Sequence, residues 1–438
     1  MLHKSFYYIF CVLVICFSFS SCLSGSKKNK KTAENNNYTP PPRSTTKVDK
    51  PLPTKPKPRN QVDTPKKTAP LPTINKEFDI ALLLPFNTQI NNLDFANDSI
   101  NDKSEMALDF YEGASIALEE LKDKGLNAKV YVYDTQKDKL KVKDILAQPH
   151  LKDVDLIIGP VYNAPLAEAN AFAKKNKVHL VSPLSPTTKF VEENPYYITV
   201  NQSIETHSRY MYDFMAKKGY KDIVLLHRES PKEQQTTDYF KSLMSSSTGV
   251  EHIGMRLEEL VWTGQDMETL ETYLVRNKKN IFVITSFNEA FANNMLRILN
   301  GFSDRYDIVV FGMPNWNKFE TLDLDHLENL NFHISSNFYE NTNSPKAISF
   351  AQKYKAAVNE LPNEYAYKGY DIVKYFGKML ERRNEEQELS MSLRSDNGAF
   401  SGFQFSPVYN PTSGEIDYFE NQKLYILQFR NFQFKKVD

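Results

Sequence analysis

Cysteine and histidine are the residues of this chain that could act as nucleophiles or metal ligands, and their spacing argues against both kinds of chemistry. All three cysteines, Cys11, Cys16 and Cys22, lie near the start of the 438-residue chain. The sequence also lacks the G-x-S-x-G turn of a nucleophilic serine and the phosphate loops G-x-x-x-x-G-K-[ST] and G-x-G-x-x-G. The seven histidines that follow the cysteines show no metal-ligand spacing: His150, His179, His207, His227, His252, His326 and His333. We therefore expect no catalytic residue, no metal site and no cofactor.

The start of the chain has the layout of a secretory signal that ends at a cysteine. A basic beginning at Lys4 is followed by an apolar stretch over residues 6–17 and two serines before Cys22. This stretch is shorter than the roughly 18 residues that a transmembrane helix needs. Residues 19–22, FSSC, resemble the lipobox of bacterial lipoproteins, although Phe19 stands where that family usually has leucine. An ordinary signal peptide with an incidental cysteine is the alternative.

The lipobox resemblance implies a signal peptide over residues 1–21 and a lipidated Cys22. Two or three acyl chains hold a protein firmly on a membrane, whereas one chain binds only marginally. In the lipoproteins that this segment resembles, an aspartate after the cysteine favours the inner membrane, and here Leu23 follows. We expect a lipid anchor in the outer membrane facing the periplasm.

Charge divides the mature chain into a basic tether and an acidic body. Residues 23–77 contain 13 Lys and Arg against 4 Asp and Glu, a net charge of +9, whereas the part from residue 78 onward has 40 basic and 50 acidic residues, a net charge of −10. Residues 22–77 are rich in Pro, Lys and Thr and poor in large apolar residues, which predicts a disordered tether. The acidic body argues against a nucleic-acid partner.

From residue 78 onward, patterns typical of buried strands alternate with patterns typical of amphipathic helices. Residues 78–86, FDIALLLPF, form an apolar run of strand length that predicts a strand buried on both faces. A helical pattern follows over residues 106–121, and the alternation restarts after residue 203. A β-rich tail follows residue 400. The alternation predicts an α/β fold with two lobes, each a mostly parallel sheet flanked by helices.

The order and spacing of several segments resemble the type I periplasmic binding proteins, specifically the branched-chain amino acid receptors that serve ABC transporters and sensory receptors. These segments are FYEGASIALEEL, LIIGPVYNAPLAEA, VHLVSPLSPT, YAYKGYDIVKYFGKML and the closing FSGFQFSP with LYILQFRNFQF. The resemblance implies a fold with three crossovers, near residues 200–203, 335–338 and 398–403. It assigns residues 78–200 with 338–400 to the first lobe and residues 201–337 with 401–438 to the second.

In the family that this chain resembles, the lobes close on a ligand at the carboxyl ends of the strands. The resemblance implies hinge residues at Val200, Asn201, Asn337 and Phe338. The implied ligand contacts are Tyr162, Asn163, Ser182, Leu184, Ser185 and Thr187 in the first lobe, with Ser286, Phe287, Asn288, Gly312, Met313 and Asn315 in the second.

Hydroxyls and backbone N–H groups beside a helix start can hold a carboxylate without a buried positive charge. The serines of SPLSP can alternatively cap their own loop. Amino acid receptors of this group usually hold the ligand's ammonium with an acidic residue of the second lobe, and the matching FGMPNW contains none.

Two functions follow from the resemblance and stay open here. The chain can be a solute receptor that captures a small polar ligand, such as an amino acid or peptide, for an ABC permease. It can instead be a scaffold that contacts a cell-envelope protein, as in the outer-membrane lipoproteins that activate peptidoglycan synthases and contain a similar pair of lobes. Neither function requires catalysis.

Overall fold

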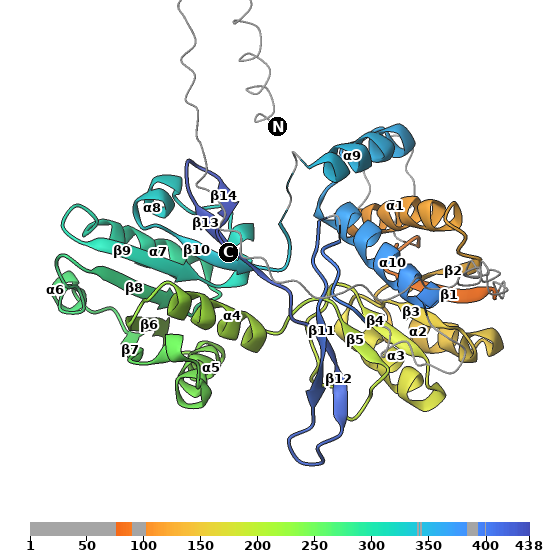
Figure 1. The fold of residues 1–438 in the computed structure, drawn as a ribbon, viewed down its shortest axis with the longest axis horizontal. Coiled ribbons are helices and arrows are strands. Elements are labelled where there is room, and N and C mark those ends of the chain that lie inside the picture. The colour runs from red at the N-terminus through yellow and green to blue at the C-terminus, as the bar shows by residue number, and fades with distance from the viewer. Residues whose placement is uncertain (1–75, 90–101, 340, 342–343, 383–392, 399) are drawn as a thin grey trace, which may run out of the picture. The chain divides into compact units, whose positions relative to one another are not determined.

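The computed structural model describes residues 76–89, 102–339, 341, 344–382, 393–398 and 400–438 (Figure 1). The predicted signal peptide, Cys22 and nearly all of the predicted tether lie outside the described residues. Within the described part, fourteen strands form two seven-stranded sheets, each with its own helices. The predicted α/β fold with two lobes is therefore confirmed.

The first sheet has the strand order β11-β12-β5-β4-β3-β1-β2. All neighbouring pairs are parallel except the hairpin of β11 and β12. Its strands are β1 (Phe78–Leu84), β2 (Ala128–Asp134), β3 (Leu156–Ile158), β4 (His179–Ser182), β5 (Tyr197–Thr199), β11 (Phe405–Tyr409) and β12 (Ile416–Asn421). The helices of this lobe are α1 (Asp102–Lys122), α2 (Lys139–Leu146), η1 (Pro149–Lys152), α3 (Asn163–Asn176), α9 (Pro345–Val358) and α10 (Glu364–Arg382).

The second sheet has the strand order β14-β13-β10-β9-β8-β6-β7, with antiparallel pairing only at β13 and β14. Its strands are β6 (Asp222–Arg228), β7 (Arg256–Trp262), β8 (Lys279–Ile284), β9 (Asp307–Gly312), β10 (His333–Ser336), β13 (Tyr425–Phe429) and β14 (Phe434–Lys436). The helices of this lobe are α4 (Ile204–Lys217), α5 (Pro231–Ser246), η2 (Val250–His252), α6 (Met267–Glu271), α7 (Glu289–Asn300), η3 (Pro314–Lys318) and α8 (Leu324–Asn329).

The apolar run of β1 is explained by helices on both faces of the first sheet (Figure 1). Successive side chains of a strand point to opposite faces. Ile80 and Leu82 accordingly join the core beneath α1, α9 and α10, whereas Ala81 and Leu83 join the core beneath α2 and α3. Because both faces are covered, every residue of β1 except Asp79 near its start is apolar, and this continuous apolar run identified the strand in the sequence.

The three connections between the lobes follow β5, β10 and β12. The first two contain the predicted hinge residues Val200, Asn201, Asn337 and Phe338. The first and third connections also contact each other, because Gln202 Nε2 donates a hydrogen bond to the Lys423 carbonyl at 2.8 Å.

The third connection is not where the sequence placed it. We expected it near residues 398–403, with all of residues 401–438 in the second lobe, but β11 and β12 extend the first sheet. Strand β12 pairs in parallel with β5 through Phe419 and Ile198. The chain therefore crosses between the lobes at residues 422–424, and only β13 and β14 of the tail belong to the second sheet.

Turns shorten two elements of the second lobe. Strand β7 begins at Arg256 because η2 and a turn at Gly254, with φ +76°, precede it. Helix α6 is short and ends at Glu271.

Candidate ligand-binding site

The first group of predicted ligand residues lies at the carboxyl ends of β3 and β4. Strand β3 leads into Gly159, whose φ is +93° and where a Cβ atom would lie 2.1 Å from the Leu83 carbonyl oxygen. Only glycine fits there, and the turn brings the chain to Tyr162, the N-cap of α3, and to Asn163, its first residue. Tyr162 is half-buried, and the Lys137 ammonium lies 5.0 Å from the centre of its ring.

The loop after β4 is held by its own hydroxyl groups and by Asn163. The Ser182 hydroxyl donates to the Ser185 carbonyl at 2.8 Å, and the Ser185 hydroxyl donates to Asn163 Oδ1 at 2.9 Å. The Thr187 backbone N–H donates to Ser185 Oγ at 3.3 Å, and the Leu184 carbonyl accepts from the Asn201 amide. Asn163, Ser182, Ser185 and Thr187 thus form one connected group, in which both serine hydroxyls are already engaged.

The second group lies at the carboxyl ends of β8 and β9. The Ser286 hydroxyl is buried and donates to Glu233 Oε1 at 2.7 Å. Asn288 is the N-cap of α7 and accepts from the Phe291 N–H at 2.9 Å. Phe287 is half-buried, and the Lys232 ammonium lies 4.3 Å from the centre of its ring.

Gly312 and Met313 are buried and support η3. A Cβ atom on Gly312 would lie 2.7 Å from the Trp316 ring, and Met313 has no exposed surface. The Trp316 indole N–H donates to the Ser286 carbonyl at 2.8 Å, so η3 is fixed against the loop after β8. Asn315 Oδ1 is buried and has no hydrogen-bond partner among the described residues. The structure therefore brings Ser286, Asn288 and Asn315 onto neighbouring segments of the second lobe.

Sequence reasoning missed an acidic residue in this second group. Glu233 is 2% exposed, and its carboxylate accepts from the Arg228 backbone N–H at 2.9 Å and from Arg228 Nε at 3.0 Å. The second lobe therefore does place a carboxylate beside Ser286, but an arginine already neutralises it. The sequence does place Glu233 at a helix start, because Pro231 followed closely by an acidic residue directly after a strand is typical of the first turn of a helix.

Among the described residues, no hydrogen bond or ion pair joins the first group to the second, but the lobes do meet near η3. The Lys318 ammonium of η3 lies 3.8 Å from Glu364 Oε2 at the start of α10. Glu364 Oε1 in turn lies 2.7 Å from the Lys368 ammonium, which donates to Asn337 Oδ1 at 3.4 Å. This junction therefore connects η3, α10 and a predicted hinge residue.

Burial sets the charge properties of this junction. Burial lowers the pKa of Lys368, and the attraction of Glu364 offsets part of that effect. Burial raises the pKa of Glu364, but Lys368 and Lys318 together outweigh it, so that the pKa of Glu364 lies below its usual value. The carboxylate and the ammonium therefore each favour the charged form of the other.

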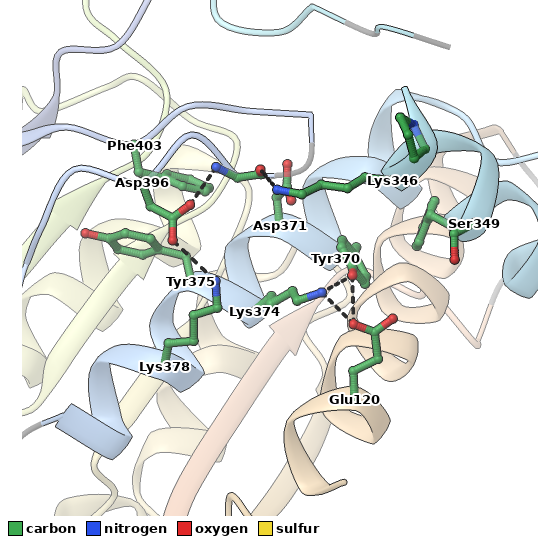
Figure 2. Close-up of a pocket in the computed structure, with 13 residues that line it drawn as sticks. Glu120, Lys346, Ser349, Tyr370, Asp371, Lys374, Tyr375, Lys378, Asp396 and Phe403 are labelled. Atoms are coloured by element: carbon green, nitrogen blue, oxygen red, sulfur yellow. Dashed lines mark hydrogen bonds and ion pairs between the residues drawn. The ribbon is translucent and has the colours of Figure 1, made fainter. Parts of the chain in front are cut away.

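A cavity of about 360 Å³ lies within the first lobe, between α9, α10, the end of α1 and the segment that precedes β11 (Figure 2). Three lysines contribute to its wall. Lys374 pairs with Glu120, Lys378 lies 3.3 Å from Asp396, and Lys346 donates to the Gly398 carbonyl at 3.2 Å. Figure 2 shows these groups pointing toward one another across the cavity wall. Because the lysines are matched by neighbouring acceptors, the cavity offers little unbalanced charge to a ligand.

Comparison with known proteins agrees with this architecture. The chain matches the periplasmic binding protein family over residues 103–390, which is more than half of its length, and it belongs to that family. The family binds solutes in the periplasm. No curated protein sequence matches the chain.

Solved structures show the same type I fold at low sequence identity. A protein from Rhodospirillum rubrum assigned to branched-chain amino acid ABC transport superimposes with a TM-score of 0.60 at 14% identity, covering 83% of this chain and 100% of its own. A branched-chain amino acid ABC transporter periplasmic ligand-binding protein from Burkholderia xenovorans gives 0.57 at 14% identity, with 82% and 94% covered. An ABC transporter substrate-binding protein from Desulfitobacterium hafniense, in complex with Leu, gives 0.53 at 14% identity, with 83% and 100% covered.

Two features are absent from the part of the chain that the structure describes. None of the helices in this part of the chain is both long and apolar enough to cross a membrane. Among the same residues, no group of three or more His, Cys, Asp or Glu side chains is placed to hold a metal ion.

Proposed function

We propose that this protein is a solute-binding lipoprotein, anchored through Cys22 in the outer membrane and facing the periplasm, which captures a small polar ligand between its two lobes. The observation that supports this proposal best is the arrangement of polar residues at the carboxyl ends of adjacent strands in both sheets, in a chain of the periplasmic binding protein family. This edge of an open parallel sheet is where α/β folds bind ligands.

The test is ligand-induced stabilisation of the full-length protein in detergent. Leucine, other amino acids, short peptides and muropeptides are added separately, and thermal unfolding is followed. A ligand at a hundredfold excess over its Kd stabilises the folded state by about 2.7 kcal/mol. A flat response across all of these compounds would refute solute binding of this class.

A pair of variants assigns any binding to the predicted residues. Asn163→Ala removes the exposed amide at the start of α3, and we expect at least a tenfold loss of affinity. Asn176→Ala, at the far end of the same helix, is the matched control and leaves the affinity unchanged. Equal affinities for the two variants would move the site away from Asn163.

The lipid anchor has its own test. Cys22→Ala removes the residue that would be acylated, so the protein is expected to leave the membrane fraction. Retention of the variant in membranes would show that Cys22 is not the anchor. Because the body of the protein is unchanged, this outcome is independent of the ligand experiment.

A scaffold role in the cell envelope is the second candidate. It is favoured by the engagement of Ser182 and Ser185 within their own loop and by the pairing of Glu233 with Arg228, which leave few free polar groups for a solute. A scaffold would retain a specific envelope protein during cross-linking in cells without any response to solutes. Failure to recover one protein repeatedly would count against this role.

A further inference from the structure

A second cavity, of about 330 Å³, lies in the second lobe at the end of the sheet opposite to the candidate ligand residues. Lys279 and His333, which line it, are the first residues of β8 and β10. Ser286 and Gly312, in contrast, lie at the carboxyl ends of β8 and β9. The cavity is therefore separate from the proposed solute site, and nothing in the proposed function accounts for it.

The wall of this cavity is positively charged. Lys218, Lys279 and Arg430 line it, and no Asp or Glu does. Lys279 is paired with Asp307 at 2.8 Å, but neither Lys218 nor Arg430 has a carboxylate partner among the described residues. The first-lobe cavity has nearly the same volume, and three acidic residues line it together with its three lysines, so volume alone does not produce this imbalance.

The positive charge stands out because the body that carries it is acidic. Residues 78–438 have 40 basic and 50 acidic side chains. A local excess of cations on a protein of net negative charge creates a confined region of positive potential, which concentrates anions there. Lys218 is held in this region, since its ammonium lies 5.2 Å from the centre of the Phe214 ring, which also lines the cavity.

The neutral polar side chains of the wall supply both hydrogen-bond donors and hydrogen-bond acceptors. The side-chain amides of Asn331 and Gln428 and the hydroxyl of Tyr220 line the same space. His333 Nδ1 lies 2.6 Å from the Asn331 carbonyl, so this nitrogen carries the proton. Burial, opposed by the hydrogen bond to the Asn331 carbonyl and assisted by repulsion from Lys218 and Lys279, lowers the pKa of His333 to about 4, so the histidine is neutral at pH 7.

We propose that this cavity binds a phosphate-bearing anion. A guanidinium fork and two ammonium groups suit the several acceptor oxygens of a phosphate group better than a single carboxylate, because arginine can donate two parallel hydrogen bonds. A volume of about 330 Å³ also accommodates more than one bare phosphate ion. The same chemistry is offered by a small phosphorylated solute and by the headgroup of a phospholipid.

The test uses the full-length protein in detergent and two double variants of equal charge. Lys218→Gln with Arg430→Gln removes the two unmatched cations of the wall. Lys217→Gln with Lys436→Gln removes two exposed cations that do not line the cavity. All four side chains are exposed, so both variants are expected to keep the melting temperature of the natural protein.

Inorganic phosphate, pyrophosphate and soluble dihexanoyl phosphatidic acid are titrated by calorimetry at low salt. We expect at least one probe to bind, and the Lys218/Arg430 variant to bind it at least tenfold more weakly than the Lys217/Lys436 variant. Tighter binding of pyrophosphate assigns a free phosphorylated solute, whereas tighter binding of the short-chain lipid assigns a headgroup. Absence of binding by every probe, or equal affinities of the two variants, overturns the proposal.

Discussion

Replacing Gly113 with alanine should destabilise the protein, although alanine is the better helix former. Helices α1 and α10 cross so closely that a Cβ atom on Gly113 would lie 1.9 Å from the Ala366 carbonyl oxygen, and one on Gly369 would lie 2.0 Å from that of Phe110. A normal contact needs about 3.4 Å, so the helices would have to separate by roughly 1.5 Å. Both obstructing atoms belong to the backbone, so no side-chain rotation can relieve the clash.

The expected magnitude is the difference between two opposing effects. Overpacking of this kind costs about 3 kcal/mol, at the upper end of its usual range. Alanine in place of glycine within a helix gains about 1 kcal/mol. The net expectation for Gly113→Ala is a loss of about 2 kcal/mol in the free energy of unfolding, measured as a lower urea midpoint at unchanged slope.

Gly377→Ala provides a graded comparison on α10. A Cβ atom there would lie 2.4 Å from Leu121 Cδ1, the end of a flexible side chain that can turn away. Its loss should therefore be clearly smaller than that of Gly113→Ala. If Gly113→Ala is as stable as the natural protein or more stable, α1 and α10 do not approach each other as closely as the Gly113–Ala366 contact requires.

Two further predictions concern charged groups of the first lobe. Burial raises the pKa of Glu120, but hydrogen bonds from Lys353, Lys374 and Tyr370 together outweigh it and lower the pKa to about 2. The stabilisation by Glu120 is therefore complete above the unfolded pKa of 4.5 and is lost as the pH falls toward 2. Glu120→Gln should reduce the loss of melting temperature between pH 4.5 and pH 2. An equal loss in the variant and the natural protein would contradict the lowered pKa of Glu120. Lys368→Met should lower the free energy of unfolding by about 2 kcal/mol, because it leaves the half-buried Glu364 carboxylate without its partner at 2.7 Å, and urea unfolding that shows no loss would exclude a stabilising ion pair.

The sequence predicted the parts of the fold that depend on local pattern. Strand β1 could be predicted because both of its faces are covered, which makes its sequence a continuous apolar run. Helix α1 could be predicted because its apolar residues recur at helical spacing. The hairpin of β11 and β12 was assigned to the wrong lobe. Its position depends on the pairing of Phe419 with Ile198, more than 200 residues away. Local alternation shows that a strand forms, but not which sheet edge receives it.

In the candidate site, too, contacts set by strand order could be predicted from the sequence, whereas contacts set by helix placement could not. Asn163 and Ser185 follow neighbouring parallel strands, so their contact could be anticipated from strand order. The contact of Ser286 with Glu233 could not, because it depends on how α5 is placed against the end of β8. Met313 is buried for a related reason: η3 folds back so that Trp316 packs against the loop after β8.

Ion pairs at Glu233 and Glu364 limit the kind of solute that the proposed site can recognise. Glu233 is bound by Arg228, and Glu364 is bound by Lys368. A ligand recognised through an ammonium group at either carboxylate would have to displace its cation, and this costs free energy because one member of each pair is buried. A ligand that presents acceptor atoms leaves both pairs intact and meets Lys232 beside Phe287. For the proposed solute site, the paired Glu233 of the second lobe and the paired Glu364 of the first lobe therefore favour a solute that is recognised through its carboxylate or other acceptor oxygens.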